Sequence, residues 1–157
     1  MSHTSDAMCF GFVSVVIEPA DYDEDGNVAN PPVIEQVRYD QFVRRLFKVD
    51  TFKEMAHHAK GGVCEEAGEL SSWIKHHLTY NESLMKVIEK EGKSQTLYQC
   101  IIEELGDIRF YLQAVQQLYN ISEQMILQHN ADKLGKRYKK LAYTDEAAQD
   151  RADKKDV

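Results

Sequence analysis

The pattern of apolar and polar residues changes character once along the chain. Residues 10–17 are rich in β-branched and aromatic side chains and end before Pro19, which predicts a strand. An acidic loop that contains Gly and Pro follows at 20–32, and from Ile34 onward apolar residues recur at helical spacing. The predicted helices cover residues 34–48, 51–77 (starting near Asp50 or Thr51), 82–92, 94–118, 122–141 and 145–153. Thr51, Ser94 and Ser122 are the predicted N-caps, and Glu54, three residues after Thr51, indicates a capping box.

These elements predict an all-α fold. Helices joined by short loops pack as antiparallel neighbours, so we expect an antiparallel bundle of about five helices. The strand and the acidic loop form a small N-terminal appendage, which must pack on the main body because an isolated hairpin is only marginally stable. The expected organisation is an appendage at 1–33, a helical bundle at 34–143, and a short helix and tail at 144–157.

Two predicted helices carry acidic residues within their apolar faces. On the helix 51–77, Glu66 and Glu69 interrupt the face, and on the helix 94–118, Glu104 lies within it and Asp107 borders it. Each helix therefore directs two carboxylates, three residues apart, towards the expected core. The apolar members of the two faces are Phe52, Met55, Ala59, Gly62 and Trp73, and Leu97, Ile101, Ile108, Tyr111 and Val115.

Carboxylates in a core need a partner, because burying an unpaired charge is very costly. Protonation, pairing with Lys or Arg, and a bound cation all satisfy this requirement. Four carboxylates on two facing helices suit Mg²⁺, which takes oxygen ligands, and the lack of a His on either face argues against iron or zinc. For one pair taken alone, ordinary solvated surface charge is the alternative.

A third polar set lies on the helix 122–141. Asn130, Lys133 and Arg137 are three and four residues apart, so they share one face. An amide and two cations that face metal-loaded carboxylates suit a polyphosphate, on which Lys acts as a point charge and Arg as a fork. Salt bridges within the protein, or compensation of the helix dipole, are the alternatives.

Composition narrows the class of protein. The 157 residues include 26 Asp and Glu against 19 Lys and Arg, a net charge of −7, which argues against an extended basic face for nucleic acid. No apolar run approaches the roughly 20 residues that span a membrane. Three widely spaced cysteines are typical of free thiols in a reducing compartment, so we expect a cytoplasmic protein, in a host cytoplasm if the source is viral.

Together these motifs resemble the MazG-like branch of the all-α nucleoside triphosphate pyrophosphohydrolase superfamily. The EExxE motif of that family stands here as Glu65, Glu66 and Glu69, and its ExxD motif as Glu104 and Asp107. The flanking stretches HHAKGGVCEEAGELSSWIKHH, EELGDIRFYLQAV and NADKLGKRY are also similar, within residues 42–153. The stretch TDEAAQDRADK looks like the tail of phage-encoded members.

The resemblance implies a Mg²⁺-dependent hydrolase, in which Mn²⁺ can substitute, that converts a nucleoside triphosphate into its monophosphate and diphosphate. In the family pattern Glu66, Glu69, Glu104 and Asp107 bind the metal, and Glu65 lies beside them or activates the water. Catalysis would thus involve Glu65, Glu66 and Glu69. The expected substrate-binding residues are Asn130, Lys133 and Arg137, with Arg151 from the tail, and with Lys53 and His58 near the base or sugar.

The resemblance also implies a homodimer or homotetramer, and we expect no nucleic-acid or membrane partner. Trp73 is expected in the core or at a subunit interface. The sequence does not identify the nucleobase of the substrate. The candidate substrates are a broad set of triphosphates, a damaged nucleotide, dUTP or dCTP, a guanine nucleotide such as dGTP in phage metabolism, or an alarmone. A non-catalytic bundle that binds nucleotide or metal, and a purely structural bundle, are the competing hypotheses. Turnover and metal dependence separate the three.

Overall fold

The computed structural model describes residues 11–47, 51–90 and 92–154 and divides the chain into two compact units. One unit is Cys9–Leu118, and the other contains Tyr119–Val157. Phe10, Lys48 and Asp50, where predicted elements begin or end, lie outside the described residues.

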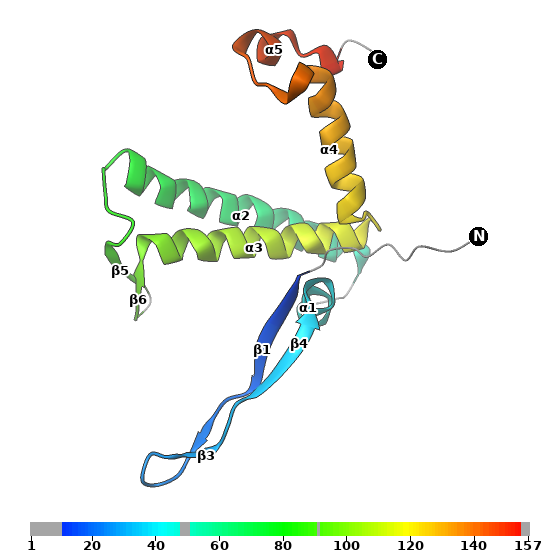
Figure 1. The fold of residues 1–157 in the computed structure, drawn as a ribbon. Coiled ribbons are helices and arrows are strands. Elements are labelled where there is room, and N and C mark those ends of the chain that lie inside the picture. Colours follow the sequence, from blue (N-terminus) through cyan, green and yellow to red (C-terminus); the bar gives the residue numbers. More distant parts are fainter. Residues whose placement is uncertain (1–10, 48–50, 91, 155–157) are drawn as a thin grey trace, which may run out of the picture. The chain divides into compact units, whose positions relative to one another are not determined.

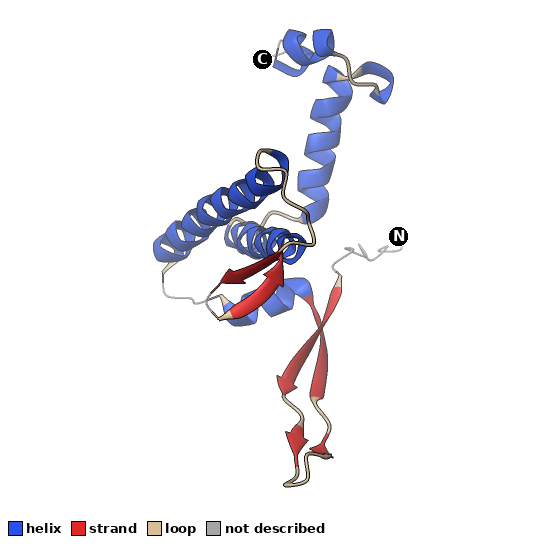
Figure 2. Cartoon of the chain, turned by 90° about the vertical axis from the view of Figure 1, so that its left-hand side faces the viewer, coloured by secondary structure: helices blue, strands red, loops and turns tan. Residues whose placement is uncertain are grey.

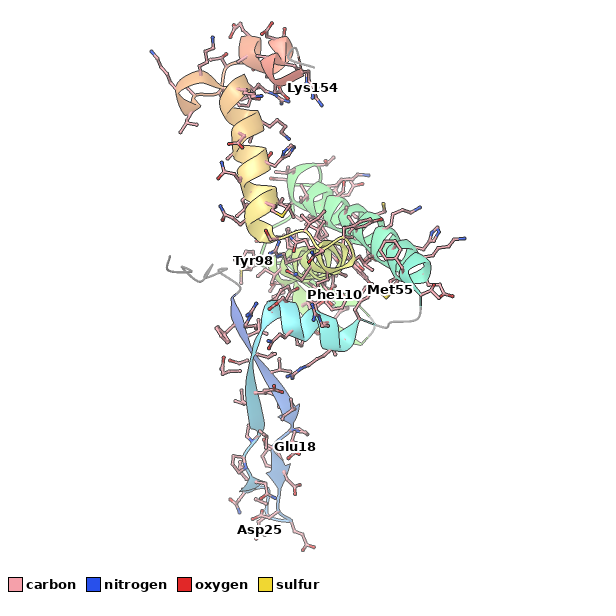
Figure 3. The ribbon with its side chains drawn as sticks, turned by 90° about the vertical axis from the view of Figure 1, so that its right-hand side faces the viewer. Glu18, Asp25, Met55, Tyr98, Phe110 and Lys154 are labelled. Carbon is pink, nitrogen blue, oxygen red and sulfur yellow. The ribbon has the colours of Figure 1, made fainter. Side chains whose placement is uncertain are left out.

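The first unit begins with a two-stranded antiparallel ribbon, which we call the arm (Figure 2). β1 (Phe12–Glu18) pairs with β4 (Val33–Arg38), and β2 (Asp21–Tyr22) pairs with β3 (Val28–Asn30) towards the tip. Glu18 lies part-way along the arm and Asp25 at its tip (Figure 3). The sequence pattern predicted one strand followed by a loop, so β2, β3 and β4 were not predicted as strands.

The helical part of this unit is built on two long helices that run side by side (Figure 1). α2 (Phe52–Leu78) and α3 (Leu97–Leu118) pack along their length, and α1 (Tyr39–Leu46) contacts α3. The predicted capping box of α2 is confirmed, because Thr51 and Glu54 exchange side-chain to backbone hydrogen bonds. These bonds satisfy N–H groups that the first turn of a helix leaves unpaired.

The main apolar core lies where α1, α2 and α3 meet. Its buried members are Val43, Phe47, Ala59 and Ala114. Met55 of α2 and Phe110 of α3 both pack against this cluster (Figure 3). The other partly buried residues around it are Tyr39, Phe42, Tyr111, Val115 and Leu118.

Two segments that were expected to be helical form strands instead. Residues 34–38 belong to β4, so the first helix begins only at Tyr39. β5 (Val87–Lys90) and β6 (Lys93–Thr96) form a hairpin, and Gly92 in its turn has a φ of 78°, which Gly adopts without strain. Across the described residues the chain is 60% helix, in five helices, and 18% strand, in three small antiparallel sheets. The expected all-α bundle is therefore wrong, and the fold mixes helix and sheet.

The hairpin also moves the start of α3. Ser94 was expected to cap this helix but lies in β6, where its hydroxyl donates a hydrogen bond to Glu89 Oε1 at 2.6 Å. The cap is Thr96, whose Oγ1 accepts a hydrogen bond from the backbone N–H of Gln99 at 3.2 Å. Gln99 Oε1 in turn accepts one from the backbone N–H of Thr96 at 2.8 Å. This reciprocal pair is a second capping box.

The second unit is helical over its described residues. It consists of α4 (Glu123–Arg137), a 3₁₀ turn η1 (Lys139–Leu141), α5 (Asp145–Asp150) and a 3₁₀ turn η2 (Ala152–Lys154). The predicted N-cap Ser122 is confirmed by the hydrogen bond that its Oγ accepts from the backbone N–H of Met125. In the part of the chain that the structure describes, no helix combines the length and the apolar character that crossing a bilayer requires.

Candidate metal centre

Three carboxylates converge between α2 and α3. Glu66 of α2 and Glu104 and Asp107 of α3 each offer an oxygen, and these oxygens all lie within 4.8 Å of one another. We call this group the triad. Glu104 is buried, at 3% exposure, Glu66 is half-buried and Asp107 is exposed. The triad is therefore closed on the side of Glu104 and open on the side of Asp107.

Close packing of the two helices brings the triad together. Gly62 lies against the ring of Tyr111, and a Cβ at position 62 would overlap ring atoms of that side chain. Glu66 follows Gly62 by one helical turn, and Asp107 precedes Tyr111 by one turn. The small residue therefore sets the helix separation next to the carboxylates.

The triad places like charges close together in a partly buried site. Desolvation, a hydrogen bond with Glu104 and the charges of Asp107, Glu104 and Glu69 raise the pKa of Glu66 to about 7. Desolvation and nearby carboxylates, Glu104 foremost, also raise the pKa of Asp107. A group of carboxylates in this state takes up a proton or a cation near neutral pH.

Trp73 of α2 is a further neighbour of the triad. Its indole Nε1 donates a hydrogen bond to Glu104 Oε1 at 3.0 Å, from α2 across to α3. The expectation for Trp73 was core packing or a subunit interface. Its position seven residues after Glu66 places both on one face of α2, and this spacing was the available signal.

The other expected residues of the first unit lie around the triad with different roles. Glu69 is half-buried and contributes negative charge to both Glu66 and Asp107, but the three converging oxygens do not include its own. Glu65 and Lys53 are exposed. The ring of His58 packs against the rings of Phe47 and Tyr111, with centroids 5.3 and 5.5 Å away. His58 therefore lies in a cluster of aromatic rings next to the triad.

The expected phosphate-binding residues belong to the second unit. Asn130 is exposed and Lys133 is partly buried on α4. Arg137 ends α4, and its Nε and Nη2 donate to the two carboxylate oxygens of Asp153 at 2.7 and 2.8 Å. These bonds lower the pKa of Asp153 to about 2. Arg151 is exposed, in left-handed conformation at the end of α5.

The composition of the triad fits a hard divalent cation. Comparisons of the chain with models of protein families, with curated proteins and with solved structures gave no match. The choice of metal therefore rests on the ligand atoms of the triad. All three are carboxylate oxygens, which Mg²⁺ prefers, while zinc favours the His and Cys ligands that the triad lacks. The open side at Asp107 leaves room for the waters that Mg²⁺ usually retains.

Proposed function

We propose that the protein is a Mg²⁺-dependent nucleoside triphosphate pyrophosphohydrolase. The convergence of Glu66, Glu104 and Asp107 from two helices carries this proposal. The resemblance of residues 65–69 and 104–107 to the EExxE and ExxD motifs supports the class of reaction. The exposure of Asp107 supports access by a substrate phosphate from solvent.

In the proposed reaction, the oxygen of a water molecule bonds to the α-phosphorus and the bond from that phosphorus to its bridging oxygen breaks. The products are a nucleoside monophosphate and diphosphate. Bound Mg²⁺ would offset the charge of the phosphates and lower the pKa of the attacking water. Glu65 and Glu69, beside the triad on α2, are the candidates to accept the proton of that water. Glu66, Glu104 and Asp107 would hold the metal.

The resemblance implies that residues of α4 are the ones that bind phosphates of the substrate. Asn130 and Lys133 supply an amide and an ammonium group for this role. Arg137 has a competing partner, because its guanidinium already holds Asp153 through two hydrogen bonds. A phosphate on Arg137 must therefore compete with that carboxylate.

Hydrolysis in ¹⁸O-labelled water tests the reaction. The purified chain is incubated with a panel of canonical and modified nucleoside triphosphates and with an alarmone, in Mg²⁺ or in EDTA, and the products are identified by ³¹P NMR and mass spectrometry. We expect diphosphate and a monophosphate that carries the label, and no product in EDTA. Label in the diphosphate would indicate attack at the β-phosphorus. Binding without turnover across the panel would indicate the non-catalytic alternative.

A pair of adjacent glutamates provides a matched test of the site. Glu104→Gln should lower turnover at least about 100-fold, because it removes a charged ligand from the triad. Glu103→Gln removes the same charge from the neighbouring exposed position and should retain most of the activity. Equal losses in both variants would mean that net charge, and not ligation, causes the effect.

We also propose that the protein is a homo-oligomer. α3 exposes Tyr98, Ile102, Leu105 and Leu112, each at least 41% accessible, and their spacing places them on one helix face. A second copy of the chain would remove this apolar face from water, as the resemblance to a dimeric or tetrameric family suggests. Light scattering should show a dimer or tetramer, and Ile102→Glu should reduce it to a monomer.

A further inference from the structure

The carboxylate of Glu104 is nearly inaccessible to solvent and receives a hydrogen bond from a neutral donor. Glu104 is 3% exposed, and Oε1 accepts a hydrogen bond from the indole N–H of Trp73 at 3.0 Å. An Arg or Lys in the place of Trp73 would orient the carboxylate but also neutralise it. An indole N–H orients the carboxylate and leaves its negative charge for a cation.

We propose that Trp73 is a positioning residue of the metal centre, which keeps the Glu104 carboxylate directed at Glu66 and Asp107. This inference rests on the proposed function, because it needs the triad to bind a metal. Hydrogen-bond partners behind metal ligands fix the orientation of those ligands in many sites. Trp73 supplies such a bond from α2 to a ligand on α3.

Trp73 is itself held by the segment that follows α2. Its ring packs against that of His76, with centroids 5.7 Å apart, and His76 Nδ1 lies 3.0 Å from Glu82 Oε2. Glu82 also accepts a hydrogen bond from Lys86 Nζ at 2.6 Å. The backbone N–H of Leu97, the first residue of α3, donates to the carbonyl of Lys86. A continuous set of contacts therefore links the start of α3, through the loop, to Glu104.

A purely structural role for Trp73 makes a different prediction from a positioning role. Loss of packing alone would lower the thermal stability of the protein equally in Mg²⁺ and in EDTA, and would leave metal affinity unchanged. Loss of positioning would weaken metal affinity by more than the change in stability explains. Metal affinity is therefore the measurement that separates them.

Calorimetric titration of the full chain with Mg²⁺, and separately with Mn²⁺, provides the test. Trp73→Phe keeps an aromatic ring and removes the N–H donor, and we expect its metal affinity to fall about tenfold. Tyr143→Phe is the matched control. It removes another aromatic-to-carboxylate hydrogen bond, from Tyr143 Oη to Asp145 Oδ1 at 3.0 Å in the second unit, and should leave metal affinity unchanged.

The outcomes separate this inference from the proposed function. Unchanged affinity in Trp73→Phe would overturn the positioning role and leave the metal centre standing. Absence of metal binding by the wild-type chain would overturn both.

If Trp73→Phe does not fold, the inference can still be tested by the tryptophan fluorescence of the wild-type chain, because Trp73 is its only tryptophan. The fluorescence should change when Mg²⁺ is added, and the midpoint of this change should equal the midpoint measured by calorimetry. Glu104→Gln should abolish the change. Fluorescence that stays constant at metal saturation would overturn the inference.

Discussion

Two buried carboxylates of this protein, Glu104 in the first unit and Asp153 in the second, have opposite surroundings. The Asp153 side chain is 1% exposed, and Arg137 donates two hydrogen bonds to it. Glu104 is 3% exposed, and its neighbours are the like-charged Glu66 and Asp107 and the neutral donor Trp73. Arg137 supplies the countercharge of Asp153, whereas a proton or a cation from solution could offset the charge around Glu104.

This difference indicates which carboxylate has a structural role. The pair of Asp153 and Arg137 ties the end of α4 to η2, which explains its place in the second unit without any ligand. The triad lowers stability when it is fully ionised, because like charges repel strongly at short range and low polarity.

The largest expected effect is a stabilisation by metal that depends on Glu104 and not on Asp153. At 100 times its Kd, Mg²⁺ should raise the free energy of unfolding by about 2.7 kcal/mol relative to EDTA. Glu104→Gln should lose this increment, whereas Asp153→Asn should retain it even though its own stability is lower. Denaturant unfolding with and without Mg²⁺ measures both. Loss of the increment in Asp153→Asn would remove the contrast between the two sites.

An intermediate effect concerns the helix packing that creates the triad. Gly62→Ala places a methyl group where the ring of Tyr111 lies, so it should lower the free energy of unfolding by about 1–3 kcal/mol and weaken metal binding. Gly61→Ala is the control, since beyond its chain neighbours and the backbone of its own helix no atom lies within 4 Å of the new Cβ, and it should raise stability by about 0.5–1 kcal/mol. Thermal unfolding and Mg²⁺ titration of both variants check this prediction. Equal behaviour of the two would show that the helix separation does not depend on Gly62.

The smallest effect is the pH dependence of the Asp153 pair. Hydrogen bonds from Arg137 lower the pKa of Asp153 from 3.8 to about 2. The stabilisation is therefore fully present above about pH 4 and is lost as the pH falls towards 2. The stability difference between wild type and Asp153→Asn should shrink over this range. A difference that stays constant from pH 5 to pH 2 would contradict the prediction.

The long helices, the strand β1 and the convergence of Glu66, Glu104 and Asp107 could be predicted from the sequence, whereas Glu69 was expected in that group and the strands β2 to β6 were missed. The periodicity of α2 and α3 extends over many turns, so it places Glu66, Glu104 and Asp107 on the faces that meet. The segment 33–38 is short, and its pattern fits either a helix or a strand. It forms a strand because it pairs with β1, which lies earlier in the sequence. Residues 87–96 were expected to be partly helical, but Gly92 permits the turn that folds them back as a hairpin.

The partners of the site residues were harder to predict than the residues themselves. The pairing of Arg137 with Asp153 depends on the turns after α4, and the spacing of Asn130, Lys133 and Arg137 alone carries no information about those turns. The bond from Trp73 to Glu104 joins residues of different helices, so it requires their relative rotation, which periodicity defines only coarsely. Tertiary contacts, and not helix faces, determined both partners.

The arm has a consequence for local stability. Among the described residues β1 pairs only with β4, and β2 only with β3. Phe12, Val16 and Ile34 are more than half exposed, so little buried apolar surface holds the arm closed. A ribbon of this kind opens at lower free energy than a packed helix pair. Amide hydrogens of β1 and β4 should therefore exchange long before those of α2 and α3, and a protease should cut the tip near Asp25 first. The chain can lose order in the arm while the triad stays assembled.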